Sequence, residues 1–305
     1  MWRFLVQNLR NHDKQLYKID EVPEYQRFNP YIRTGYRSSQ TYLQCLKSLL
    51  YFHNETMNIW THVLGFLAFG TLLAWDMYAP PSKVSWEDFA VILCIITCYQ
   101  ACMILSAVYH TFTAHSKQVS DTCLCLDLAG IAASITASYV SGIYYAFFCS
   151  PDWRNFYLVT VGIIITLGLL FRNILKNDKY VKIRLVYFVL WALYGTVPAL
   201  HWVYLSGGFG DEIVRIFLPR IVIMYAISGL AFLFYIGKIP ERFGPGKFDY
   251  LGSSHQWWHV LIFLCLAYWH NTGFTFAEFR LENQCAPSID PALKQRILEK
   301  FWINF

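Results

Sequence analysis

The stretch Ser253-Ser254-His255-Gln256-Trp257-Trp258-His259 leads directly into the apolar run from Val260 to Ala267. His255 and His259 are four residues apart, slightly more than one helical turn, so both imidazoles project from the same face of a helix. Ionisable side chains within membrane helices are costly and usually functional. This stretch therefore predicts a membrane helix that carries a polar site at its start.

Apolar segments of similar length recur along the rest of the chain. The 305 residues are 56% hydrophobic and 15% charged, whereas about 25% of the residues of a soluble domain are charged. A helix needs roughly 20 apolar residues to cross a bilayer. Seven stretches meet this requirement, at residues 59–78, 88–111, 124–148, 154–172, 184–205, 216–236 and 255–276. The sequence therefore predicts an all-α membrane protein with a seven-transmembrane helix bundle.

The positively charged residues indicate how the bundle is oriented. With a cytoplasmic N-terminus, the cytoplasmic segments hold 17 Lys and Arg residues and the opposite segments hold 8, and such residues are enriched on the cytoplasmic side. We expect a cytoplasmic N-terminal segment at 1–58, a seven-span domain at 59–276 and a non-cytoplasmic amphipathic tail at 277–305. The excess positive charge of +5 is then mainly on the cytoplasmic side, where it faces anionic lipids, and it does not indicate nucleic-acid binding.

The two chain ends carry further amphipathic spacing. Near the N-terminus, Trp2, Leu5, Val6 and Leu9 suit a short interfacial helix. In the tail, six apolar residues share one helical face and suit either a membrane-surface helix or an eighth packed element: Leu293, Ile297, Leu298, Phe301, Trp302 and Phe305. Two of the cysteines, Cys149 and Cys285, would both lie on the non-cytoplasmic side and could pair.

Four polar residues fall at one depth of a bundle with a cytoplasmic N-terminus. His110 ends the second span, Asp127 starts the third, and His255 and His259 start the seventh. Three neutral imidazoles suit Zn²⁺, which takes three protein ligands in catalytic sites and leaves a fourth position for water. The sequence therefore predicts a zinc site at the cytoplasmic ends of these spans.

Two further residues are candidates for chemistry at that site. Asp127 could hold the water and take its proton, or it could orient a histidine. Ser106 is one turn before His110 and could hydrogen-bond a substrate carbonyl or the water, or only its own helix backbone.

Each of these features also has a purely structural interpretation. A lone histidine in a membrane helix is often an interhelical hydrogen-bonding residue, and His62, His201 and His270 are interpreted in this way. His115, in the loop after His110, is the alternative ligand. Ser253 and Gln256 could form a capping box at the start of the seventh span. The pattern Asn54-Glu55-Thr56 is either a helix start or an N-glycosylation acceptor.

Several motifs together resemble those of the progestin and adipoQ receptor family. They occur in family order between about residue 30 and residue 276: Asn54-Glu55-Thr56-Met57-Asn58-Ile59-Trp60-Thr61-His62, Ser106-Ala107-Val108-Tyr109-His110, Leu126-Asp127-Leu128-Ala129-Gly130-Ile131, Pro240-Glu241-Arg242-Phe243 and Ser254-His255-Gln256-Trp257-Trp258-His259. The resemblance implies an adiponectin-receptor-like seven-helix domain with a cytoplasmic N-terminus. It also implies zinc bound at His110, His255 and His259, with Asp127 and Ser106 beside it.

The resemblance implies two classes of function. The short N-terminal segment and the stretch Tyr250-Leu251-Gly252-Ser253-Ser254-His255 are most similar to a Golgi-resident branch of the family. That branch implies a Golgi membrane scaffold that tethers Raf kinase and lowers Raf, MEK and ERK signalling, and this is the function we expect. The adiponectin-receptor branch implies the alternative, a zinc-dependent, ceramidase-like amidohydrolase within the membrane or a ligand-regulated receptor. Deleting residues 1–50 would then abolish tethering and spare hydrolysis.

Overall fold

The computed structural model describes residues 14–78, 85–171, 178–283 and 285, and the described part is helical. The predicted helices around Trp2 and in the tail after Cys285 lie outside these residues. Seven helical stretches in the described part are long and apolar enough to cross a membrane, which confirms the predicted fold class. They are α3 (Thr56–Tyr78), α4 (Trp86–Phe112), α5 (Lys117–Ala146), α6 (Pro151–Leu170), α8 (Val181–Tyr194) with α9 (Thr196–Leu205), α10 (Glu212–Gly237) and α11 (Ser254–Glu282).

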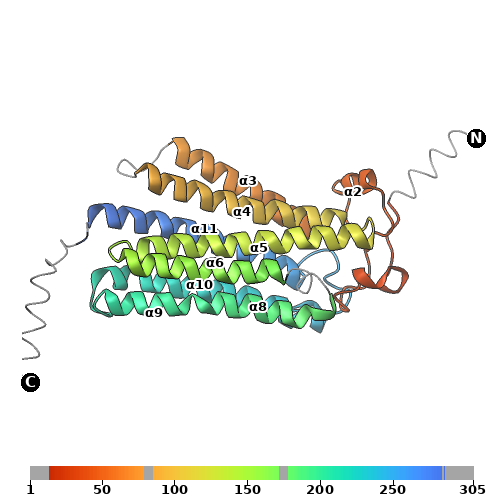
Figure 1. Ribbon diagram of the computed structural model, residues 1–305. Helices are drawn as coiled ribbons and strands as arrows, with labels where there is room; N and C mark the ends of the chain where they lie inside the picture. The colour runs from red at the N-terminus through yellow and green to blue at the C-terminus, as the bar shows by residue number, and fades with distance from the viewer. Residues whose placement is uncertain (1–13, 79–84, 172–177, 284, 286–305) are drawn as a thin grey trace, which may run out of the picture.

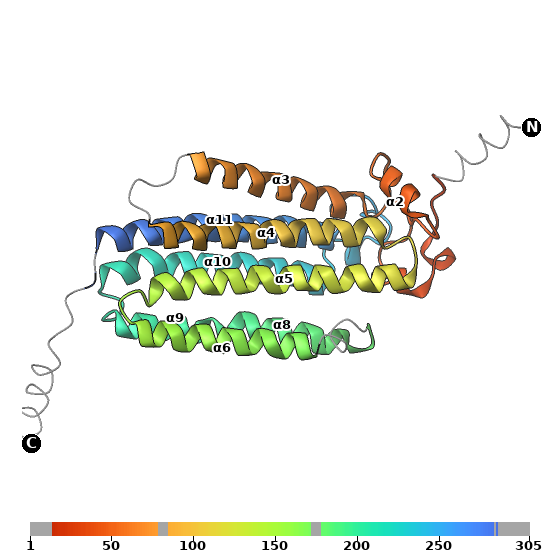
Figure 2. The same ribbon diagram turned by 45° about the horizontal axis from the view of Figure 1, so that its top comes forward.

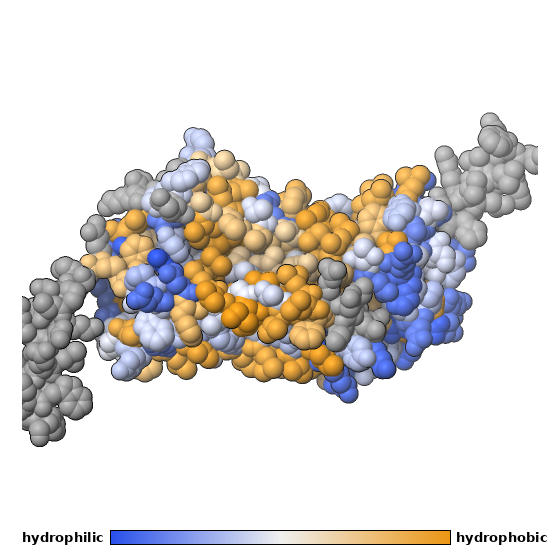
Figure 3. All heavy atoms as spheres, in the orientation of Figure 1, coloured by the Kyte–Doolittle hydropathy of each residue, from blue (hydrophilic) through white to orange (hydrophobic). Residues whose placement is uncertain are grey.

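The spans form a bundle around α11, which packs against α3, α4, α5 and α10. Figure 2 shows α3 at one edge of the bundle and α6, α8 and α9 on the opposite side. In Figure 3, hydrophobic residues cover the middle of the visible face, as a lipid-facing surface requires. The protein is therefore a multi-pass membrane protein.

Close approach between α4 and α5 depends on a glycine. A Cβ at Gly130 would lie 2.9 Å from the Cα atom of Cys102, closer than two carbon atoms can pack. Around this contact, buried apolar residues from α3, α4, α5 and α11 form one core cluster that includes Phe69, Tyr99 and Trp269. The tight packing fixes α4 against α5, and with it the last turn of α4.

The fifth span is broken into α8 and α9 at Gly195. Carbonyl groups just before the break accept hydrogen bonds from tyrosines on neighbouring helices. The Tyr139 hydroxyl from α5 donates to the Trp191 carbonyl, and the Tyr225 hydroxyl from α10 donates to the Ala192 carbonyl at 2.9 Å. Two neighbouring helices therefore hold the broken span in place.

Residues 14–55 fold over one end of the bundle. They contain η1 (Ile19–Glu21), η2 (Glu24–Gln26) and α2 (Tyr42–Ser48), with further short helices η3 (Asp178–Tyr180) and η4 (Glu241–Phe243) between spans. The Asp249 carboxylate accepts hydrogen bonds from the backbone N–H groups of Arg33 and Thr34, at 2.9 and 2.8 Å. This joins the N-terminal segment to the loop before α11, at the right-hand end of Figure 1.

The opposite end of the bundle carries a disulfide. Cys149, after α5, pairs with Cys285, after α11, as the sequence allowed. Arg280 in α11 also donates to the carbonyl groups of Tyr145 and Ala146 at the end of α5, at 3.0 and 3.1 Å. The ends of α5 and α11 are therefore tied together far from α2 (Figure 1).

Candidate metal centre

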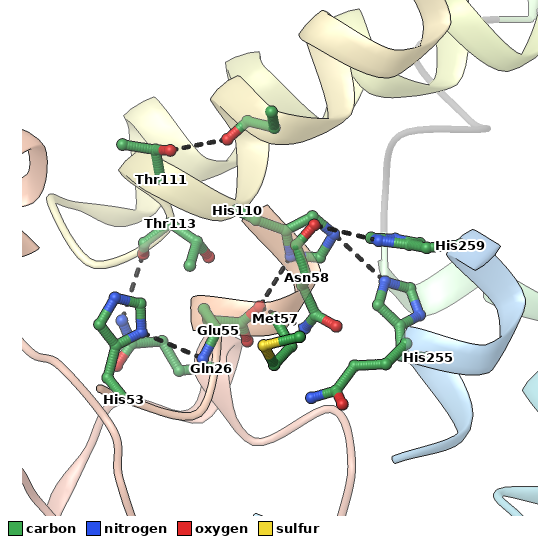
Figure 4. Close-up of polar contacts among 12 residues, drawn as sticks. Gln26, His53, Glu55, Met57, Asn58, His110, Thr111, Thr113, His255 and His259 are labelled. Atoms are coloured by element: carbon green, nitrogen blue, oxygen red, sulfur yellow. Dashed lines mark hydrogen bonds and ion pairs between the residues drawn. The ribbon is translucent and has the colours of Figure 1, made fainter. Parts of the chain in front are cut away.

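Three histidines from two helices meet near the N-terminal end of α11. His110 lies in the last turn of α4, and His255 and His259 lie in the first two turns of α11. One nitrogen atom from each lies within 4.8 Å of the others, and the three rings face one another in Figure 4. Two of these residues are buried and His255 is partly exposed, and all three line one cavity.

The hydrogen-bond partners of these rings fix which nitrogen carries the proton. His110 Nδ1 lies 2.7 Å from Glu55 Oε2, and His259 Nδ1 lies 3.1 Å from the Asn58 carbonyl oxygen. A carboxylate and a carbonyl can only accept, so Nδ1 donates in both histidines. The lone pair of each ring therefore lies on Nε2, the nitrogen that remains for a metal ion.

The nitrogen spacing also suits a metal ion. His110 Nε2 and His255 Nε2 are 3.2 Å apart. A tetrahedral zinc ion with Zn–N bonds of about 2.0–2.1 Å keeps its ligand nitrogens roughly 3.3 Å apart. The three histidines therefore form a cluster that is compatible with metal binding.

Ser106 and Asp127 line the same cavity as the three histidines. Ser106 is buried in α4, one turn before His110. Asp127 lies in α5 and faces the same cavity. All five residues that the sequence singled out therefore line one cavity, and the three histidines among them form a cluster.

Glu55 is a further residue of the site that the sequence analysis treated only as part of a helix start. It directly precedes α3, is 5% exposed, and accepts from Asn58 Nδ2 at 2.7 Å as well as contacting His110. Burial raises the pKa of Glu55, but the contacts with His110 and Asn58 outweigh it and lower the pKa to about 2. Glu55 is therefore an ionised carboxylate. The feature of the sequence that could have identified it as part of the site is the position of an acidic residue directly before a membrane span.

The residues that cap the N-terminus of α11 are not the ones that the sequence predicted. Ser253 makes no side-chain capping bond, and Gln256 Oε1 instead accepts from the Gly252 N–H at 2.6 Å, so the predicted capping box is wrong. The buried Glu241 accepts from the Ser254 N–H at 2.7 Å and from the Ser254 hydroxyl. A negative carboxylate at a helix N-terminus satisfies its free N–H groups.

The remaining histidines take structural positions. His201 lies 2.9 Å from the Tyr157 hydroxyl, and His270 lies 3.0 Å from Asp76 Oδ2. The His115 ring packs against the tilted Tyr42 ring with centroids 4.0 Å apart, outside the histidine cluster. His62 stacks on His259 with ring centroids 3.7 Å apart.

The helix start at Thr56 and the burial of Asn54 favour the structural interpretation of the Asn54-Glu55-Thr56 pattern.

A cavity of about 1930 Å³ extends from the histidine cluster through the bundle. Its far end reaches Trp202 and Phe276, and most of its wall consists of apolar side chains from α5, α8, α9, α10 and α11. The cluster therefore lies at one end of a long, mainly apolar chamber.

These features define a class of protein: a polytopic helical membrane protein with a histidine cluster, compatible with metal binding, that opens on an apolar cavity. The family model described as "Haemolysin-III related" matches residues 50–270. The chain belongs to the progestin and adipoQ receptor family.

Three relatives illustrate the spread of this family. "Progestin and adipoQ receptor family member 3" from Homo sapiens is 43% identical over 277 residues, which cover 89% of each chain. "Heptahelical transmembrane protein 1" from Arabidopsis thaliana is 32% identical and covers 89% of this chain and 84% of the relative. The "Adiponectin receptor protein" of Drosophila melanogaster is 31% identical over 88% of this chain and 62% of the relative.

Proposed function

We propose that the protein binds Zn²⁺ through His110, His255 and His259 and hydrolyses a ceramide-like lipid amide within the membrane. The observation that carries this proposal is the shared cavity, which all three histidines, Ser106 and Asp127 line. Its volume of about 1930 Å³ exceeds the roughly 300–1,000 Å³ of ordinary small-molecule pockets. A mainly apolar chamber of this size suits long acyl chains.

The polar residues have distinct roles in this proposal. Zinc held by three neutral imidazoles supplies Lewis acidity and lowers the pKa of water at the site. Hydrolysis adds the hydroxyl of water to the acyl carbon and a hydrogen to the departing amine. Asp127 accepts the proton of the water and returns it to the amine, and the Ser106 hydroxyl donates to the substrate carbonyl oxygen. The apolar wall holds the acyl chain and excludes other water.

The substitution Asp127→Asn tests this reaction. It removes the proton acceptor and keeps the shape, so we expect hydrolysis of ceramide in detergent micelles to fall by about 100-fold or more, with zinc content unchanged. Asp152→Asn is the control, because Asp152 is an exposed acid in the first turn of α6 and does not line the cavity. Equal ceramide hydrolysis by the two variants would refute the assignment of Asp127.

We also propose that the N-terminus and the histidine cluster face the cytoplasm. The Cys149–Cys285 disulfide lies at the other end of the bundle, and disulfides persist in oxidising compartments such as the secretory pathway and the cell exterior. The excess of Lys and Arg in the segments assigned to the cytoplasm supports the same orientation. Residues 1–58 are then cytoplasmic and the tail from residue 277 is not.

A second proposed function is that of a Golgi membrane scaffold that tethers Raf kinase and lowers Raf, MEK and ERK signalling. The 43% identity to the human relative named family member 3, across 89% of both chains, favours it, because the Golgi-resident branch is the part of the family that these motifs resemble. Residues 14–55 offer a folded surface at the proposed cytoplasmic end, with exposed charged side chains such as Lys14, Lys18 and Glu24.

The scaffold proposal needs a surface substitution as its test. Deleting residues 1–50 does not separate the two functions, because the deletion removes Arg37 and Asn29, which bond to His110 and Glu241. The pair Lys14→Glu and Lys18→Glu changes exposed charges only. We expect it to reduce co-purification of Raf kinase and Asp127→Asn to leave co-purification unchanged. Loss of Raf kinase only with Asp127→Asn would contradict the scaffold proposal.

A further inference from the structure

The motif from Glu55 to His62 contacts two of the three clustered histidines. Glu55 Oε2 lies 2.7 Å from His110 Nδ1, and Asn58 Nδ2 donates to the same Glu55 oxygen at 2.7 Å. Figure 4 shows this chain of contacts running from Asn58 through Glu55 to His110. The His110 ring is therefore fixed by a carboxylate that is itself held in place.

The same motif contacts His259 one helical turn further along α3. The Asn58 carbonyl oxygen and the Thr61 hydroxyl lie 3.1 and 3.2 Å from His259 Nδ1. The His62 ring stacks on the His259 ring with centroids 3.7 Å apart and an interplanar angle of 20°. Two polar contacts and one stacked ring therefore set the orientation of His259.

We propose that Glu55, Asn58, Thr61 and His62 are positioning residues that hold His110 and His259 with their Nε2 lone pairs turned toward a metal ion. This inference rests on the proposed zinc site and adds the part of the chain that prepares it. A partner that accepts the Nδ1 proton fixes the ring and raises the basicity of the ligand nitrogen. α3 supplies no ligand of its own and determines how well the other two helices bind the metal.

A matched pair of substitutions separates this role from general stabilisation. Glu55 with His110 and Asp76 with His270 are both buried carboxylate–histidine pairs, at 2.7 and 3.0 Å, but only His110 belongs to the cluster. Zinc affinity is measured on the full-length protein in detergent by competition with a chelator. Cobalt loading provides a second measurement, because its visible spectrum reports the geometry of the ligands.

We expect Glu55→Gln to weaken zinc binding by about 10–100-fold and to shift the cobalt spectrum. Asp76→Asn should leave both unchanged, although each substitution lowers thermal stability. If Glu55→Gln does not fold, Thr61→Val gives the same test at His259, with an expected weakening of roughly two- to tenfold.

Three results would overturn the inference. Zinc affinity that is the same in Glu55→Gln and Asp76→Asn would refute the positioning role while leaving the zinc site intact. If Glu55→Gln does not fold, unchanged zinc affinity in Thr61→Val would do the same. A well-folded wild-type protein that binds no zinc would refute the zinc site and the inference together.

A different observation concerns α2 and the turn that follows it, beside the start of α3 (Figure 1). Cys45 and Ser48 face the protein and are buried, whereas Leu43 and Leu50 are 62% and 86% exposed. Leu46 and Phe52 are exposed as well. We call Leu43, Leu46, Leu50 and Phe52 the exposed set, because neighbouring exposed apolar side chains of this kind mark interaction or membrane surfaces.

The exposed set continues into the lipid-facing side of α3. Trp60 in α3 donates from its indole Nε1 to the Leu49 carbonyl at 3.2 Å, and the next exposed residues on α3 are Leu64 and Leu67. Tryptophan is enriched where a span meets the membrane surface. We infer that α2 and the turn after it lie in the interfacial layer of the bilayer, where the exposed set inserts among the lipids.

Photo-crosslinking in lipid nanodiscs tests this placement. Benzoylphenylalanine is introduced at Leu43 or Leu50 of the full chain, with Leu64 as the span control and the exposed Glu24 as the aqueous control. We expect phosphatidylcholine adducts at positions 43 and 50 at a level close to that at position 64. Adducts no more frequent than at position 24, or crosslinks between two copies of the chain, would overturn the inference.

Discussion

At the scale of single residues, Arg37 joins the N-terminal segment to the end of α4. Arg37 is 2% exposed, and its guanidinium donates to the carbonyl groups of His110 and Thr111 at 2.7 and 3.1 Å, and to Ser48 Oγ at 2.6 Å. The last carbonyl groups of a helix have no partner within it. Arg37 therefore satisfies the end of the helix that carries His110.

Replacing Arg37 by lysine tests this role. Lysine keeps the charge but lacks the planar, forked set of donors, so at least one of these bonds is lost. We expect Arg37→Lys to lower the free energy of unfolding by about 2–3 kcal/mol, measured by thermal unfolding in detergent. Arg33→Lys, at an exposed side chain, should change it by less than about 0.5 kcal/mol. Equal effects from both would contradict the role of Arg37.

His53 gives a prediction about acid stability. The side chain is fully buried and its Nδ1 accepts from the Glu55 N–H at 3.1 Å. Burial and the nearby Arg37 charge lower the pKa of His53 to about 3. In the unfolded chain the same imidazole binds a proton near pH 6.5. The contribution of the buried, neutral His53 to the free energy of unfolding is therefore complete above that pH and declines as the pH falls toward 3.

At pH 5 this effect removes about 2 kcal/mol of the free energy of unfolding. The measurement is the difference in unfolding midpoint between the wild-type protein and His53→Gln from pH 7.5 to pH 5, because other acid effects cancel in that difference. We expect the two profiles to converge as the pH falls. Profiles that stay parallel would show that His53 titrates normally.

At the scale of elements, α11 depends on a residue far outside its own first turn. The local pattern predicted Ser253 and Gln256 as the cap, but Glu241 occupies that position through bonds to Ser254. Asn29 Nδ2 also donates to Glu241 at 2.9 Å. The N-terminal segment, η4 and α11 are therefore joined at one carboxylate.

The substitution Glu241→Gln tests this junction. The new amide group cannot accept at both oxygens, so a buried N–H or hydroxyl loses its partner. We expect the free energy of unfolding, measured by thermal unfolding in detergent, to fall by about 1–3 kcal/mol. Glu212→Gln, at an exposed acid in the first turn of α10, is the control with a smaller expected effect. A loss in the control as large as in Glu241→Gln would contradict the assignment.

Hydropathy predicted the spans well but not the full helices. The third span was expected from residue 124, whereas α5 begins at Lys117, because Ser116 caps the helix by accepting from the Val119 N–H. The fifth span was expected as one helix and is broken at Gly195. Polar first turns and local breaks leave little trace in hydropathy, since they depend on capping and on hydrogen bonds from neighbouring helices.

At the scale of the whole molecule, the histidine cluster could be anticipated because span ends on one side of a membrane share a depth. This argument placed His110 beside His255 and His259 without any contact information. It could not find the partners of these histidines, because Glu55 and Asn58 contact them across 55 and 201 residues of sequence. Such pairs depend on how α3 lies against α4 and α11.

The proposed orientation also makes a prediction at this scale. Epitope tags at the two termini should differ in access when cells are permeabilised first at the plasma membrane and then at internal membranes. We expect antibody binding to the N-terminal tag after the first step and to the C-terminal tag only after the second. Binding to the C-terminal tag after the first step alone would reverse the orientation.

The central claim is that His110, His255 and His259 bind a metal ion, and the most direct test is the zinc content of the purified protein. Mass spectrometry of detergent-purified wild-type protein is compared with the double variant His255→Ala/His259→Ala. A catalytic site with three protein ligands predicts about one zinc per chain in the wild type and loss of that zinc in the double variant. Well-folded wild-type protein without zinc, or zinc retained in the double variant, would contradict the account.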